Sequence, residues 1–303
     1  MFDPRYEAQV RLLLQCLPLL RAHSDFALKG GTAINLFVES MPRVSVDIDL
    51  TYLPLKPRTE TLATIDAGLR DLKHEMAQRI PDVTVEEQRS SGRVVRLQVA
   101  GPETSIKIEP NLIFRGSVYP PEGKDLCAKA QQRFQASVRV QTLNVADLYG
   151  GKLCAALDRQ HPRDLYDVAL LLNDLGITPD IRRAFVVYLA GHNRPMSELL
   201  QPRLKDIATT YDERFVGMTD HEIPLDELAS VQAELPSLLR HALDDDERAF
   251  LISLKRGTPE WKRLGIDHLA QLPALQWKLL NIRRMEKEKH REALRKLEEV
   301  LSS

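Results

Sequence analysis

Two aspartates lie one residue apart in the apolar segment Val44–Leu50, and this pair constrains the fold more than any other feature of the chain. Side chains of a β-strand alternate between two faces, and the backbone rises about 3.3 Å per residue. In a strand over residues 44–53, Asp47 and Asp49 would share one face about 7 Å apart, while the apolar residues beside them face a core. Because neighbouring carboxylates repel each other, the pair predicts a cation site on a buried strand.

The sequence Lys29-Gly30-Gly31-Thr32 precedes this strand. Glycine lets backbone N–H groups approach a phosphate closely, because it has no side chain in the way. Thr32 is predicted to cap a helix that runs to Glu39. Together with the acid pair, the glycine turn indicates a site for a divalent metal and a triphosphate.

The overall composition narrows the kinds of partner. The 303 residues carry a formal net charge of −1, so any contact with nucleic acid must come from local basic patches. The cysteines Cys16, Cys127 and Cys154 match no metal-site spacing and are predicted to be reduced. Charges interrupt every apolar run before membrane-spanning length, and no signal pattern opens the sequence. We therefore expect a cytoplasmic protein without membrane contact.

Hydrophobic periodicity divides the chain into a sheet-containing part and a helical part. The patterns predict helices over residues 6–22 and 58–79, a short apolar segment over residues 26–28, and strands over residues 83–87, 94–100 and 105–109. This order favours an α+β fold with a mixed sheet and flanking helices over a doubly wound parallel sheet. From Asn144 helical periodicity dominates, so we expect a sheet domain over residues 1–142 and a helical domain over residues 143–303.

A third acid lies in the strand predicted over residues 105–109. Alternation places Lys107 and Glu109 on one face of that strand. If this strand pairs beside the acid-bearing strand, Glu109 completes a cluster of three carboxylates with Asp47 and Asp49. Such a cluster binds Mg²⁺ through oxygen ligands, and two metals about 3.5–4 Å apart could activate an attacking hydroxyl. The alternative is that Glu109 lies on a solvated face.

A second charged cluster follows in the helical part. Lys152 and Arg159 share one helical face by their spacing, and Pro162 is predicted to begin a new helix. Asp164 and Asp167 then share a face of that second helix. A lysine directed at a phosphate-binding turn would neutralise the triphosphate and the charge that develops on transfer. The alternative is a structural pair of helices joined by arginine–aspartate ion pairs.

Other residues also admit two interpretations. Arg43 and Ser45 flank the acid pair and could contact phosphate, although Arg43 could instead pair with a surface carboxylate. Trp261 and Trp277 are expected in the helical core, not in a base-stacking platform. The basic cluster near the C-terminal end could bind an RNA backbone or form a solvated helix face; it comprises Arg283, Arg284, Lys287, Lys289 and Arg291.

The order of these motifs resembles the AbiEii-type nucleotidyltransferase toxins, which belong to the polymerase-β-like nucleotidyltransferases. The resemblance extends over about residues 25–285. The motifs that carry it are Gly-Gly-Thr, Arg-x-Ser-x-Asp-x-Asp, Ile-Lys-Ile-Glu and Lys-Leu-x-Ala-Ala-Leu-x-Arg-x-x-Pro-Arg-Asp-Leu-Tyr-Asp. It implies a polymerase-β-like mixed sheet and a helical half that completes the active-site cleft.

The resemblance also implies roles for individual residues. The phosphate-binding turn would be Gly30, Gly31 and Thr32, the metal ligands Asp47 and Asp49 with Glu109 as third carboxylate, and the phosphate-contacting cation Lys152. Asp164 or Asp167 would be the essential downstream acid. Threonine stands where many members of the superfamily have serine, and it keeps the hydroxyl.

The function that the resemblance implies is Mg²⁺- or Mn²⁺-dependent transfer of a nucleoside monophosphate from an NTP to an acceptor, with release of pyrophosphate. The expected acceptor is a tRNA 3′ end, and the expected partner is the antitoxin of a type IV toxin–antitoxin pair. The alternatives are nucleotidylation of a protein, a nucleotide-binding protein without turnover, and a purely structural protein. The last leaves the adjacent acids unexplained.

Overall fold

The structure is a computed structural model that describes residues 2–302 in two compact units. The first unit contains the described residues up to Leu148 together with Val216–Glu222. The second contains Tyr149–Phe215 and the described residues from Ile223 onward. The first unit therefore extends six residues beyond the predicted boundary at 142 and includes a short segment from much later in the chain.

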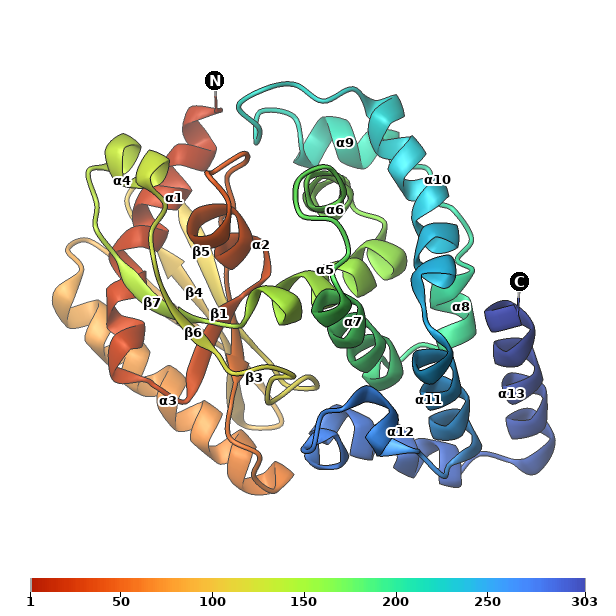
Figure 1. Cartoon of the computed structure of the whole chain (residues 1–303). Helices are drawn as coiled ribbons and strands as arrows, with labels where there is room; N and C mark the ends of the chain where they lie inside the picture. Colours follow the sequence, from red (N-terminus) through yellow and green to blue (C-terminus); the bar gives the residue numbers. More distant parts are fainter. Residues whose placement is uncertain (1, 303) are drawn as a thin grey trace. The chain divides into compact units, whose positions relative to one another are not determined.

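The first unit combines a seven-stranded sheet with helices (Figure 1). Its elements in chain order are α1 (Pro4–Cys16), a 3-10 turn (Leu17–Ala22), β1 (Phe26–Lys29), α2 (Gly30–Ala33) with a π-helical turn (Ile34–Val38), β2 (Ile48–Tyr52), α3 (Arg58–Arg79), β3 (Thr84–Ser90), β4 (Arg93–Ala100), β5 (Ser105–Asn111), β6 (Glu122–Asp125), α4 (Ala128–Phe134) and β7 (Arg139–Thr142).

The sheet is mixed, which confirms the predicted α+β class. The strand order is β3-β4-β5-β2-β1-β7-β6. β2 pairs with β5 and β1 pairs with β7 in parallel, whereas the other neighbouring pairs are antiparallel. The parallel β2–β5 pair sets Asp49 opposite Glu109, as the sequence analysis required for the two acids to meet.

Apolar residues on one face of the central strands bury against helices. Ile48, Leu50 and Tyr52 alternate along β2 and are fully buried. Helix α3 packs on β3 and β4, and α1 on β5. Gly68 of α3 lets the helix approach the ring of Phe26 in β1, since a Cβ there would lie 3.0 Å from that ring. The polar side chains of β2 lie on the opposite face of the strand.

Two local predictions in this unit are wrong. The helix after β1 begins at Gly30 with Lys29 as N-cap, so Thr32 lies inside it and does not cap it. Instead, the Thr32 hydroxyl donates to the carbonyl oxygen of Asp47 at 2.5 Å. β2 begins only at Ile48, and residues 44–47 form no regular structure. The strand-alternation argument therefore holds for Asp49 and not for Asp47.

The second unit is helical throughout its described residues. Helix α5 (Val145–Arg159) begins in the first unit and continues into the second. The later elements are α6 (Pro162–Asp174), α7 (Pro179–Gly191), α8 (Met196–Leu200), α9 (Ala208–Arg214), α10 (Leu225–Ala242), α11 (Asp245–Arg256), 3-10 turns (Trp261–Leu264 and Leu269–Gln271), α12 (Pro273–Arg283) and α13 (Lys287–Ser302).

Local signals explain where these helices begin. Pro162 is the first residue of α6, as predicted, and the ring of His161 caps the helix by accepting from the N–H of Arg163. A capping box of Asp244 and Glu247 begins α11. The core prediction for Trp277 is wrong, because its side chain is 52% exposed.

Candidate active site

The glycine turn lies directly against the carboxylate of Asp49. Gly30 has a φ of 70°, a left-handed conformation that other residues rarely adopt. A Cβ built on Gly30 would lie 2.3 Å from Oδ2 of Asp49, which leaves no room for a side chain. In the β1–β2 pairing, Lys29 stands opposite Asp49. The backbone of the turn and Lys29 therefore both lie beside Asp49.

Gly31 places the same turn against Arg43 and Ser45. A Cβ on Gly31 would lie 2.6 Å from Nη2 of Arg43 and 2.9 Å from Oγ of Ser45. Arg43 is only 2% exposed, and its Nη1 donates to the carbonyl oxygen of Val44 at 2.9 Å. The guanidinium of Arg43 is therefore buried beside the turn. A guanidinium and a hydroxyl beside a glycine turn supply the donors and the charge that a phosphate needs.

A segment from much later in the chain holds Arg43 in place. Thr219 forms an isolated β-bridge with Arg43, and the N–H of Val44 donates to the carbonyl oxygen of Met218 at 2.8 Å. Both later residues belong to Val216–Glu222, the segment that returns to the first unit. This support is not predictable from the sequence, because no periodicity or motif links segments so far apart.

Arg96 is the second residue that the sequence analysis missed. Its Nη2 lies 2.7 Å from Oε2 of Glu109 across the β4–β5 pair. The hydrogen bond to Glu109 raises the pKa of Arg96 despite partial burial, and the charges of Asp47 and Asp49 raise it further. Alternation along β4 is the signal that could have placed Arg96 on this face, but only the strand order shows that it lies beside the acids.

The acids provide a donor set that suits a hard divalent cation. Asp47, Asp49 and Glu109 all offer carboxylate oxygens, and Asp49 has no side chain between it and the turn. Within residues 2–302, however, no three acid, histidine or cysteine side chains gather closely enough to form a metal-holding group. Glu109 is instead paired with Arg96. Its role as third ligand therefore stays a prediction.

The second unit brings Lys152, Asp164 and Asp167 together. Nζ of Lys152 lies 2.7 Å from Oδ1 of Asp164 and 2.8 Å from Oδ2 of Asp167. All three side chains are buried, and the lysine is 6% exposed. Gly150 allows the close packing of α5 on α7, because a Cβ there would lie 2.7 Å from the backbone nitrogen of Phe185. Lys152 is thus held between two acids from α6.

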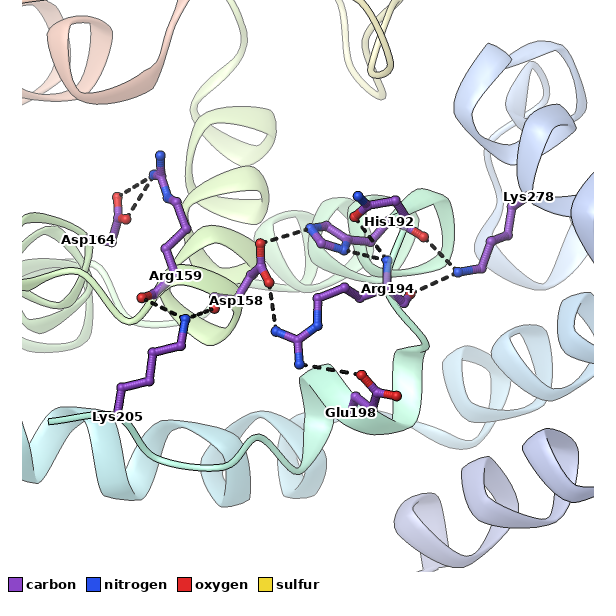
Figure 2. A network of polar contacts seen from close by, with 9 residues as sticks. Asp158, Arg159, Asp164, His192, Arg194, Glu198, Lys205 and Lys278 are labelled. Carbon is purple, nitrogen blue, oxygen red and sulfur yellow. Dashed lines mark hydrogen bonds and ion pairs between the residues drawn. The ribbon is translucent and has the colours of Figure 1, made fainter.

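Arg159 supplies the second positive charge of this cluster (Figure 2). Its Nη2 lies 2.8 Å from Oδ2 of Asp164, and its side chain is 62% exposed. Burial alone would raise the pKa of Asp164, but the charges of Lys152 and Arg159 lower it below the ordinary value. Asp164 is therefore ionised, and the cluster contains two cations and two carboxylates.

Other polar contacts fix the end of α5 (Figure 2). Lys205 donates from Nζ to the carbonyl oxygens of Asp158 at 3.0 Å and Arg159 at 3.3 Å. Cations at a helix C-terminus satisfy its free carbonyl groups and oppose its dipole. The Asp158 carboxylate in turn accepts from Arg194 at 2.7 Å. These contacts position the last turn of the helix that carries Lys152.

Comparison with known families settles the classification. Residues 11–281 match the family described as nucleotidyl transferase AbiEii toxin, type IV TA system. The chain belongs to the AbiEii nucleotidyltransferase toxin family. This AbiEii protein is therefore a nucleotidyltransferase, and its family implies an NTP substrate and an antitoxin partner.

A solved structure supports the fold of this AbiEii protein. MenT4, a nucleotidyltransferase toxin from Mycobacterium tuberculosis H37Rv, matches it with a TM-score of 0.58 and 17% sequence identity. The match covers 92% of this chain and 93% of MenT4. A comparison with curated proteins finds no match. Among the described residues of the AbiEii protein, no helix is long and apolar enough to cross a membrane.

Proposed function

We propose that this AbiEii protein transfers a nucleoside monophosphate from an NTP to the 3′ end of a tRNA and releases pyrophosphate. The observation that carries the proposal is the contact of the Gly30-Gly31 turn with Asp49 on one side and with Arg43 and Ser45 on the other. Phosphate donors and a metal-binding acid thus meet without an intervening side chain. A structural role needs no such arrangement.

In this proposal, Asp47 and Asp49 hold Mg²⁺, with Mn²⁺ as the alternative metal and Glu109 as a third ligand. The metal, when bound, neutralises phosphoryl oxygens and lowers the pKa of the attacking hydroxyl. Glu109 must exchange its contact with Arg96 to serve as a ligand, since the two are 2.7 Å apart. Arg96 would then be left to balance the charge of the acids.

The residues of the turn bind the triphosphate. Backbone N–H groups of Gly30 and Gly31 and the side chains of Arg43 and Ser45 supply hydrogen-bond donors that fix the phosphates before transfer. The Thr32 hydroxyl holds the backbone of Asp47 at 2.5 Å. Thr32 thus orients a metal ligand.

We further propose that Lys152 and Asp164 of the second unit take part in transfer, with Asp167 as the other candidate acid. Lys152 offsets phosphate charge, and its ion pairs with the two carboxylates hold its amino group in place. A type IV antitoxin is the expected partner. We place the protein in the cytoplasm, where NTPs and tRNA are available.

The direct test uses purified protein, Mg²⁺, total tRNA and each α-labelled NTP in turn. We expect label in tRNA with the wild-type protein, and a loss of about 1,000-fold or more with Asp49→Ala. Circular dichroism checks that the variant is folded. Label in protein bands alone would mean that the acceptor is a protein and not tRNA. Equal labelling of tRNA by the wild type and by Asp49→Ala would show that Asp49 is not needed for transfer.

A further inference from the structure

Arg115 carries a buried charge that forms no ion pair with an acid among residues 2–302. The residue follows β5 and is 7% exposed. Its Nε and Nη1 are buried without a hydrogen-bond partner. Burial lowers its pKa, and the charge of Arg58 lowers it further. An uncompensated charge inside a protein is costly, so its retention calls for an anion that supplies the missing partners.

Tyr52 provides a second unpartnered polar atom, and its electrostatic interaction with Arg115 acts to raise the pKa of the arginine. Its side chain is fully buried, and its hydroxyl has no hydrogen-bond partner in the structure. The N–H of Gly116 donates to the carbonyl oxygen of Tyr52 at 2.8 Å, which sets the Arg115 loop beside the end of β2. The edge of the Tyr52 ring packs on Phe26 with centroids 5.7 Å apart, so the ring is held in place.

The N-terminal end of α3 lies close by in the sequence. Helix α3 begins at Arg58, six residues after Tyr52, and its N-cap, Pro57, provides no side-chain hydrogen bond. The acid of the first turn, Glu60, is engaged by Lys56 at 2.9 Å. The first turn of this 22-residue helix thus combines free N–H groups with the charge of Arg58.

We propose that Arg115, the Tyr52 hydroxyl and Arg58 form a binding site for a phosphate group. A guanidinium presents several N–H donors in a fixed plane, which matches the oxygens of a phosphate, and the tyrosine hydroxyl donates one more. The same phosphate chemistry is offered by free phosphate and by an RNA backbone.

This site is separate from the candidate active site. Asp49 and Tyr52 are three residues apart on β2, which puts them about 10 Å apart along the strand and on opposite faces. Tyr52 pairs with Phe26, which packs under α3, whereas Asp49 contacts the glycine turn. The proposal therefore stands whether or not the proposed transfer reaction is correct.

The first experiment measures binding of inorganic phosphate to the full chain by calorimetry, at constant ionic strength. We expect Arg115→Met to weaken the binding at this site by about 10- to 100-fold, as expected for loss of a charged hydrogen bond. The matched control, Arg79→Gln, removes an exposed charge from the far end of the same helix and should leave binding unchanged. Equal phosphate binding by wild-type protein and Arg115→Met would overturn the proposal.

Stability separates a binding role from a structural one. Without phosphate, Arg115→Met should unfold at the same temperature as the wild type or a higher one, because an unpaired buried charge is removed. Added phosphate should then raise the unfolding temperature of the wild type far more than that of the variant. A large loss of stability in phosphate-free Arg115→Met would show that the arginine is structural.

Tyr52→Phe keeps the ring packing and removes one hydroxyl. We expect it to fold normally and to weaken phosphate binding by about 3- to 10-fold.

Crystals soaked in selenate locate the bound anion independently. An anomalous peak beside Arg115 in the wild type supports the site, and its absence there contradicts it. Weaker binding of a short labelled RNA by Arg115→Met would identify an RNA backbone as the source of the phosphate, and unchanged RNA binding would identify free phosphate.

Discussion

The two charged clusters of this protein differ in what lies against their acids. In the second unit, Lys152 is buried between Asp164 and Asp167, with contacts of 2.7 and 2.8 Å. In the first unit, the glycine turn lies so close to the Asp49 carboxylate that a Cβ on Gly30 would be 2.3 Å from Oδ2. One cluster sets its acids against a buried cation, and the other sets an acid against backbone that carries no side chain. The presence of charge alone therefore does not describe either cluster; the groups that lie against the charge do.

Removing the buried lysine should have the largest effect on stability. Lys152→Met removes the buried cation that pairs with both carboxylates and leaves Asp164 only the exposed Arg159, so we expect the free energy of unfolding to fall by about 3–5 kcal/mol. Urea denaturation measures this value. Lys107→Met removes an exposed lysine from the sheet and should change it by less than about 0.5 kcal/mol. Similar values for the two variants would mean that the Lys152 cluster is not structurally important.

The close contact between the glycine turn and Asp49 can be tested directly. Gly30→Ala would add a Cβ 2.3 Å from the Asp49 carboxylate at a φ of 70°. Gly92 also has a positive φ but has open space around it, so Gly92→Ala measures the backbone strain alone. We expect Gly30→Ala to cost about 1–3 kcal/mol more than Gly92→Ala in unfolding free energy, and to reduce nucleotide transfer. An equal loss of unfolding free energy in the two variants would show that the turn and Asp49 can move apart to accommodate the added Cβ.

The pH dependence of stability should report on the second cluster. The pKa of Asp164 is lowered in the folded protein from its ordinary value of 3.8. A lowered folded-state pKa stabilises the protein above the unfolded-state value, and this contribution is lost as the pH falls through the folded-state value. Below pH 3.8 this one group should therefore contribute a slope of up to about 1.4 kcal/mol per pH unit. Asp164→Asn should reduce the slope in acid-denaturation curves, and an unchanged slope contradicts the assignment.

Much of the fold was predictable because it depends on local pattern. Helix α3 was predicted over residues 58–79 and has those bounds, because its apolar spacing is regular. β6 was not predicted, since Glu122–Asp125 contains no apolar residue and is ordered by pairing with β7. Residue type also failed to predict burial at Trp277, which is apolar but exposed.

The parts of the candidate site that lie close together in the sequence were predictable. The parts that come together only through the order of the strands were not. The glycine turn and Asp49 were found because glycine and acid stand in one short stretch. The partnership of Arg96 with Glu109 needs the order of β4 and β5, and the support of Arg43 by Thr219 needs a segment that returns from far along the chain. Asp47 was singled out partly by a strand position that the structure does not give it, since β2 begins at Ile48.

The proposed function requires that Asp49 and the glycine turn beside it bind a metal and a triphosphate. Isothermal titration with non-hydrolysable analogues of each NTP, with and without Mg²⁺, tests it most directly on wild-type protein and Asp49→Asn. The account predicts Mg²⁺-dependent binding by the wild type, and loss of that binding in a variant whose unfolding free energy changes by no more than about 1 kcal/mol. Equally tight Mg²⁺-dependent binding by a folded Asp49→Asn variant would contradict it.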